Sequence, residues 1–115
     1  MRRSPLIEKS KAFAINIIKI CNKIKQDKKE SVLTNQLIRS GTSIGANIHE
    51  ANYAHGKADF VAKLQIALKE CYESEYWIEL LISTSYLNIE QVYILEDCKE
   101  IRRMLIASCR TAKDD

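Results

Sequence analysis

Histidine and carboxylate side chains offer the chain its widest chemistry, but their spacing fits no metal centre. His49 and His55 lie six positions apart, on different faces of a helix, whereas a His-Glu-x-x-His zinc site needs a gap of four. No glutamate is followed three residues later by a histidine, which a di-iron bundle would require. The sequence also has no glycine-rich phosphate loop after a strand. We therefore expect no catalytic residues, no metal, no other cofactor and no enzymatic activity.

Acidic residues crowd one segment of the chain, at Glu70, Glu73, Glu75 and Glu79. Glu75 and Glu79 share a helix face with Tyr72, but general acid–base catalysis would need burial that shifts their pKa values. Such a run more often forms a solvated face or a set of salt-bridge partners. A carboxylate-dependent enzyme is therefore the least favoured of the functions considered.

The four cysteines, Cys21, Cys71, Cys98 and Cys109, are scattered and contain no Cys-x-x-Cys pair. They fall among apolar positions, which predicts buried free thiols rather than a disulfide framework or a zinc site. Free thiols indicate a reducing compartment, and we expect a cytoplasmic protein. No apolar run is long enough to span a membrane, so we expect no membrane partner.

Positive charge is concentrated at the start of the chain, although the net charge is only +3. Residues 1–29 hold nine basic and two acidic groups, whereas residues 64–115 hold six basic and ten acidic groups. This gradient indicates either a surface for a polyanion or complementary charge between packed elements. The candidate nucleic-acid contacts are Arg2, Arg3, Lys9, Lys19, Lys23, Lys25, Lys28 and Lys29. Lysines contact phosphates without reading sequence, so such binding would be non-specific and salt-sensitive.

Residues 36–51 form a helical run that keeps two glycines, Gly41 and Gly45. Each interior glycine costs a helix about 1 kcal/mol relative to alanine, so we expect close packing against this backbone. A polar stripe follows one flank of the same helix: Gln36, Arg39, Ser43, Asn47 and Glu50. This stripe is either solvated surface or a contact surface between helices or between subunits. We predict the contact surface, with an oligomeric rather than monomeric protein.

Hydrophobic periodicity predicts a single all-α domain over residues 1–115, with helices over about 4–26, 31–54, 58–83 and 88–111. Short connections make successive helices antiparallel, which gives an up-down-up-down four-helix bundle. Ser4, Ser31 and Asn88 are predicted N-caps, with Gln91 as the capping-box partner of Asn88. Gly56 is predicted to end the second helix in a left-handed conformation.

Three segments resemble a bacterial four-helix-bundle family, the 23S rRNA intervening sequence proteins. The first is the run from Gln36 to Ala51, with Ser-Ile, Asn-Ile and Glu in the family's order, although many members have glycine at the position of Ala51. The others are the segment from Phe60 to Leu81 and the segment 100–105. The resemblance covers nearly the whole chain.

The resemblance implies a homopentameric ring of antiparallel bundles without enzymatic activity. A relative is the accessory protein of diversity-generating retroelements, which resembles a basic pentameric barrel that binds nucleic acid and a reverse transcriptase. We therefore expect an oligomeric scaffold that binds structured RNA, or a nucleic-acid-processing protein, through the basic first helix. The alternative is a protein-binding adaptor without nucleic-acid affinity, in which the lysines serve subunit contacts.

Overall fold

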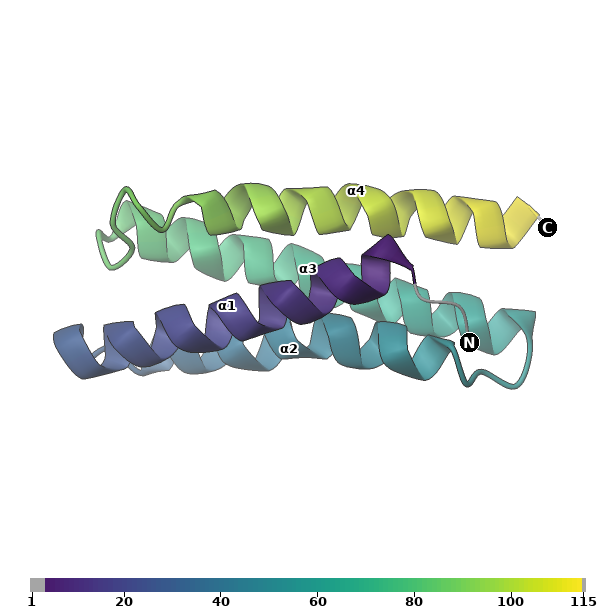
Figure 1. Cartoon of the computed structure of the whole chain (residues 1–115), viewed down its shortest axis with the longest axis horizontal. Helices are drawn as coiled ribbons and strands as arrows, with labels where there is room; N and C mark the ends of the chain where they lie inside the picture. The colour runs from purple at the N-terminus through teal and green to yellow at the C-terminus, as the bar shows by residue number, and fades with distance from the viewer. Residues whose placement is uncertain (1–3, 115) are drawn as a thin grey trace.

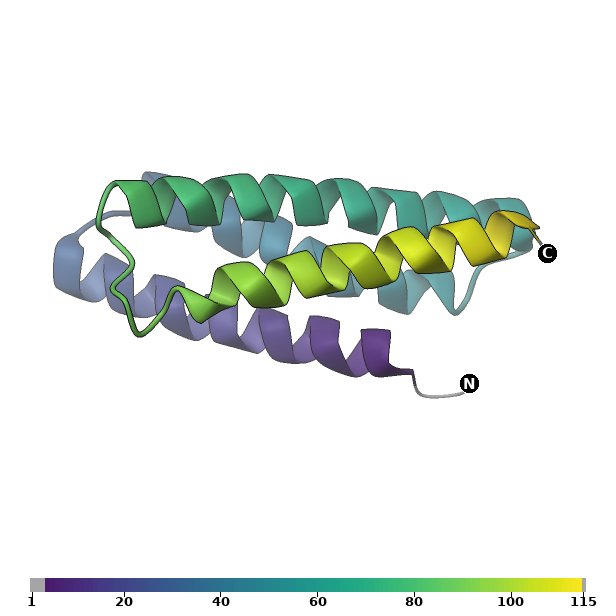
Figure 2. The same ribbon diagram turned by 90° about the horizontal axis from the view of Figure 1, so that it is seen from above.

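The computed structural model describes residues 4–114, and these residues form four α-helices and no strand. The helices are α1 (Pro5–Lys28), α2 (Val32–Ala51), α3 (Lys57–Ser83) and α4 (Tyr93–Asp114). They run alternately up and down along a rod of 47 × 21 × 20 Å (Figures 1 and 2). The predicted all-α bundle is confirmed.

The helices pack in a closed circuit, because each one contacts its neighbours in sequence and α1 also contacts α4. One apolar stripe from each helix fills the space between them. Its fully buried members include Ile17 of α1, Leu37 and Ile44 of α2, Ile78 of α3 and Leu105 of α4. The core therefore runs along the long axis and fixes which side of each helix faces outward.

The first helix has its predicted N-cap, and both of its ends lie within two residues of the predicted ends. Ser4 is the N-cap of α1, and its hydroxyl accepts a hydrogen bond of 3.2 Å from the backbone N–H of Ile7. Pro5 follows at the first helical position, where a missing N–H costs nothing. The helix ends at Lys28, after which Lys29 takes a left-handed conformation with φ of 59°.

The start of α2 is capped by a residue that we did not predict. Ser31 occupies the N-cap position, but its side chain makes no capping hydrogen bond. The buried carboxylate of Glu30 instead accepts from the backbone N–H groups of Leu33 and of Thr34, the latter at 3.0 Å. A negative charge at this point also favours the positive end of the helix dipole.

We expect Glu30→Ala to lower the free energy of unfolding by about 1 to 2 kcal/mol, because two helix N–H groups lose their acceptor. Ser31→Ala is the matched control and should change stability by less than about 0.5 kcal/mol. Urea unfolding followed by circular dichroism measures both values. Equal losses in the two variants would contradict the assignment of Glu30 as the cap.

Two predicted helix ends are wrong. α2 ends at Ala51 rather than near residue 54, and Gly56 has an extended φ of 174° just before α3. Ser85, at φ 65°, and Lys29 are the non-glycine residues with left-handed backbone in the described chain, and no described glycine has a left-handed φ. The α3–α4 connection is longer than expected, so α4 begins at Tyr93 and not at Asn88.

The predicted pair of Asn88 and Gln91 does meet, but it closes a turn instead of starting the helix. The backbone N–H of Asn88 donates to the Gln91 side chain at 3.0 Å, and the Asn88 side chain accepts from Glu90 N–H at 3.0 Å. Bonds between residues three apart follow, such as Ile94 N–H to the Gln91 carbonyl. Regular α-helix therefore starts only after this turn.

Candidate functional site

The polar stripe of α2 lies along the edge where α2 meets α3, and two of its members cross to that helix. Arg39 pairs with Glu70 at 3.3 Å and with Glu73. Further along the same edge, Lys63 donates to Glu50 at 2.8 Å. Arg39 and Glu50 thus hold α2 and α3 together within one chain.

The Arg39 cluster forms a charged corner that includes an aromatic donor. Trp77 Nε1 donates to Glu73 Oε2 at 3.0 Å. This hydrogen bond and the neighbouring Arg39 hold the pKa of Glu73 below its usual value. The hydrogen bond to Glu73 in turn raises the pKa of Arg39. Both groups therefore remain ionised around neutral pH.

The remaining stripe residues do not reach α3. Ser43 donates to the Arg39 carbonyl at 2.7 Å, and Asn47 donates to the Ser43 carbonyl at 2.9 Å, both within α2. Gln36 is exposed. The role of these three residues in a contact between subunits stays a prediction.

A buried serine pair near the Arg39 corner was not predicted. Ser74 of α3 donates to Ser40 of α2 at 2.8 Å, and both residues are fully buried. The spacing gives a signal for Ser40, which follows Leu37 by three positions and precedes Ile44 by four, and so lies on the apolar stripe. The two side chains are small enough to let α2 and α3 approach closely, and each hydroxyl gives the other a hydrogen-bond partner.

The glycines of α2 face α1. A Cβ atom added at Gly41 would lie 3.2 Å from the Cγ2 of Ile17, and one at Gly45 would lie 3.5 Å from the hydroxyl of Ser10. Gly41 therefore sits in the tighter contact. The expected close packing against this helix is formed by α1.

The glutamates of α3 serve mainly as ion-pair partners. Glu70 and Glu73 hold Arg39, and Glu75 accepts from Arg102 of α4 at 2.8 Å. Arg102 also lies over the ring of Tyr72, 5.5 Å from its centroid. Three of the four crowded carboxylates thus join α3 to its neighbours.

Acidification should weaken the Arg39 corner. The folded-state pKa of Glu73 is lowered, so its stabilising contribution is present above the unfolded pKa, near 4.3, and is lost as pH falls through the folded value. Glu73→Gln should therefore lose less stability between pH 7 and pH 3 than the wild type, as measured by urea unfolding. Glu79→Gln, at an exposed position of the same helix, should behave like the wild type. Identical pH profiles for wild type and Glu73→Gln would contradict this account.

The basic residues of α1 divide into bound and free groups. Lys9 pairs with Glu100 of α4 at 3.0 Å, and Lys28 donates to the carbonyls of Ser85 and Tyr86 at 3.0 and 3.2 Å. These lysines fasten α1 to its surroundings. Lys29, just after the end of α1, donates from its side chain to the Gln26 carbonyl of that helix at 3.1 Å.

The remaining basic candidates are more available. Lys23 is exposed and pairs only with Asp27, four residues along the same helix. Lys19 is exposed and Lys25 half-buried, and neither side chain forms a hydrogen bond or ion pair within residues 4–114. Lys19 and Lys23 lie one turn apart on one side of α1, while Lys25 lies further around it. Arg2 and Arg3 lie outside the described residues.

Several apolar side chains remain exposed on outer helix faces. α3 exposes Ile66, Tyr72 and Tyr76, and α1 exposes Ile15 and Ile18. The ring of Tyr76 also contacts the ring of Trp77, with centroids 5.3 Å apart. Exposed aromatic residues in a group are typical of protein interfaces.

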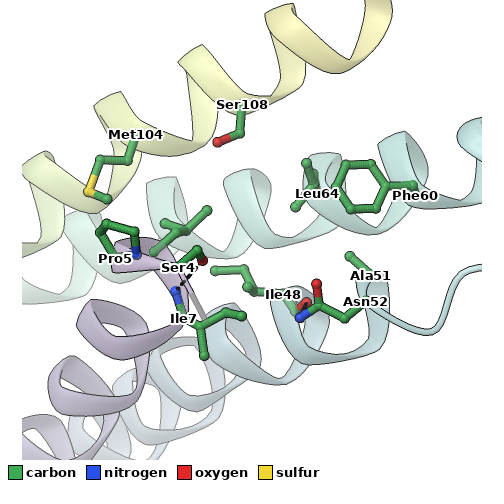
Figure 3. A pocket seen from close by; sticks show the side chains of 11 residues that line it. Ser4, Pro5, Ile7, Ile48, Ala51, Asn52, Phe60, Leu64, Met104 and Ser108 are labelled. Carbon is green, nitrogen blue, oxygen red and sulfur yellow. Dashed lines mark hydrogen bonds between the residues drawn. The ribbon is translucent and has the colours of Figure 1, made fainter. Parts of the chain in front are cut away.

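An apolar hollow of about 340 Å³ opens beside the first turn of α1 (Figure 3). Ile48, Phe60, Leu64 and Met104 give it apolar walls, and Asn52 is among the polar residues at its edge. The labelled side chains include residues of all four helices, so every helix contributes to the hollow.

A metal site and a membrane-spanning helix each require particular features of the described residues. No cluster of three or more His, Cys, Asp or Glu side chains in this part of the chain is arranged to hold a metal ion. None of the described helices is long and apolar enough to cross a membrane.

Comparison with known proteins identifies a matching family and a similar solved structure. A family model described as 23S rRNA-intervening sequence protein matches residues 2–107. A crystal structure from Bacteroides thetaiotaomicron, described as a protein of unknown function from the S23 ribosomal protein family, is similar at 48% identity. The two structures superpose with a TM-score of 0.88 over 90% of this chain and 97% of that chain. No curated protein matches the sequence.

Proposed function

Because the chain belongs to the 23S rRNA-intervening sequence protein family, we propose that it is a non-enzymatic oligomeric scaffold that binds structured RNA, alone or in a nucleoprotein, through the outer side of α1. The assembly is the homopentameric ring that the family resemblance implies. The protein is expected to work in the cytoplasm.

The observation that carries the RNA-binding proposal is the division of the α1 lysines. Lys9 pairs with Glu100, and Lys28 donates to carbonyls of the α3–α4 connection, so both ammonium groups already have partners within the bundle. Lys19, Lys23 and Lys25 are left without a partner on another helix. Three lysines without a tertiary role suit weak phosphate contacts, and a ring repeats them by symmetry so that the contacts add.

The exposed apolar residues support the oligomeric part of the proposal. A helix that is apolar on its outer as well as its inner side is normally covered. Ile66, Tyr72 and Tyr76, which are exposed on α3, give that helix such a character.

The second candidate function is a protein-binding adaptor without nucleic-acid affinity. It is favoured by the exposed tyrosines of α3 and by the charge gradient, because the lysines of α1 would then pair with acidic residues of a neighbouring copy. Under this alternative the same three lysines stabilise the ring and do not contact RNA.

The test combines a mass measurement with an RNA titration. Light scattering on the eluting protein should give about 66 kDa for a pentamer of the 13.2 kDa chain. Fluorescence anisotropy with labelled RNA hairpins of increasing length at about 50 mM salt should show binding that grows with length and ignores sequence. A ring that binds no RNA at this salt supports the adaptor, and a stable monomer overturns the scaffold.

A further inference from the structure

Two cysteines that are 27 positions apart in sequence lie against each other in the core. Cys71 of α3 and Cys98 of α4 are both fully buried, and their sulfur atoms are 3.8 Å apart. The contact is reciprocal, since Cys71 Sγ lies 3.3 Å from the Cys98 carbonyl and Cys98 Sγ lies 3.4 Å from the Cys71 carbonyl. The remaining cysteines, Cys21 and Cys109, are buried free thiols with no sulfur partner.

We propose that Cys71 and Cys98 are a modification site, at which a peroxide joins α3 to α4 by a reversible disulfide. A disulfide needs a sulfur separation of about 2.05 Å, so the two sulfur atoms must approach by about 1.8 Å. Shared between two side chains, this is less than 1 Å each, within the reach of a χ1 rotation. Each sulfur already touches the backbone of the opposite residue, so the helices need little rearrangement.

The reaction consumes one hydrogen peroxide and leaves two water molecules. One thiol loses its proton and attacks a peroxide oxygen, the O–O bond breaks, and the departing hydroxide takes up the proton as water. The product is a sulfenic acid on that cysteine. The second sulfur then attacks the sulfenic sulfur, the S–S bond forms, the S–O bond breaks, and the departing hydroxide takes the second thiol proton. The two thiols are oxidised by two electrons in total, and the peroxide is reduced.

The environment of the pair makes this reaction slow while the bundle is closed. The hydrogen bond to Cys71 and burial both raise the pKa of the Cys98 thiol. The attacking species is the thiolate, and little Cys98 thiolate is present at neutral pH because its pKa is raised. Formation of the disulfide therefore depends on transient opening between α3 and α4, and the site responds to sustained exposure to peroxide and not to a brief pulse of it.

The cross-link should stabilise the fold, because it closes a long loop. The residues between the two cysteines include the whole α3–α4 connection from Thr84 to Val92. Closing such a loop removes conformations from the unfolded chain more than from the folded bundle. We expect the melting temperature of the oxidised protein to rise by roughly 10 °C.

The test exposes the folded full-length protein to hydrogen peroxide, blocks the remaining thiols with a maleimide under denaturing conditions, and maps peptides by mass spectrometry without reduction. The wild type and Cys21→Ala should both give one cross-link between the peptides of Cys71 and Cys98, removed by dithiothreitol. Cys71→Ala and Cys98→Ala should give none. Circular dichroism before treatment establishes that each variant is folded.

Three results overturn the proposal. The first is recovery of Cys71 and Cys98 as maleimide adducts, or as sulfinic acids, after exposure that oxidises other residues. The second is a mixture of cross-links in which Cys21 or Cys109 takes part as often as this pair. The third is a cross-linked product that melts below the reduced protein, because native geometry would then not favour the bond. If Cys71→Ala does not fold, the comparison of Cys98→Ala with Cys21→Ala still decides the outcome.

Discussion

Gly41→Leu is expected to lower the free energy of unfolding by about 2 to 3 kcal/mol, because the contact between α1 and α2 has no room for a side chain. Even a single Cβ atom there would lie 3.2 Å from Ile17 Cγ2, and Ile17 is fully buried. A leucine must displace Ile17 or separate the two helices. Urea unfolding followed by circular dichroism measures the loss.

Two matched variants separate this packing effect from helix propensity. Ala46→Leu places the same side chain at an exposed position of α2 and should change stability by less than about 0.5 kcal/mol. Gly45→Ala places a Cβ at an ordinary contact distance of 3.5 Å, so it should be neutral or stabilise by up to about 1 kcal/mol through helix propensity. Gly41→Leu and Ala46→Leu with the same unfolding midpoint would contradict the account.

Replacing Lys19, Lys23 and Lys25 together by glutamine is expected to weaken RNA binding by at least about tenfold at low salt. Each lost phosphate contact also removes about 0.9 from the slope of log affinity against log salt on a duplex. A ring multiplies the effect, because every copy loses the same contacts. Anisotropy titrations at several salt concentrations measure both affinity and slope.

The control for this variant removes the same charge from the other half of the bundle. Lys69, Lys99 and Lys113 lie on α3 and α4, and their replacement by glutamine should leave the slope nearly unchanged. Both variants should keep the mass of the wild-type ring. Loss of the ring in the α1 variant, with RNA affinity kept, would assign the three lysines to subunit contacts instead of RNA contacts.

The sequence predicted the helices well because each carries one apolar face with helical spacing, and this face is what the bundle buries. Helix ends were harder, because they depend on local competition for hydrogen bonds. The side chain of Glu30 accepts hydrogen bonds from N–H groups at the start of α2, whereas the predicted cap, Ser31, accepts none. Asn88 and Gln91 form the expected contact, but it closes a turn.

The sequence predicted only those features of the candidate site that lie within a single helix, and not the contacts between helices. The spacing placed Arg39 and Glu50 on one edge of α2, but their partners on α3 depend on how the two helices slide past each other. Core packing sets that register. The same reason hides the contact between Cys71 and Cys98, which no spacing along the chain reveals.

The most direct test of the central proposal is to find where RNA touches the protein. RNA carrying photoactivatable nucleotides can be cross-linked to the intact ring at about 50 mM salt, where phosphate contacts are strong, and the attached peptides identified by mass spectrometry. The account predicts cross-links concentrated on α1 between Ile15 and Gln26, which contains the three available lysines, and their loss in the lysine-to-glutamine variant. Cross-links confined to α3 and α4, or none above an unrelated protein, would contradict it.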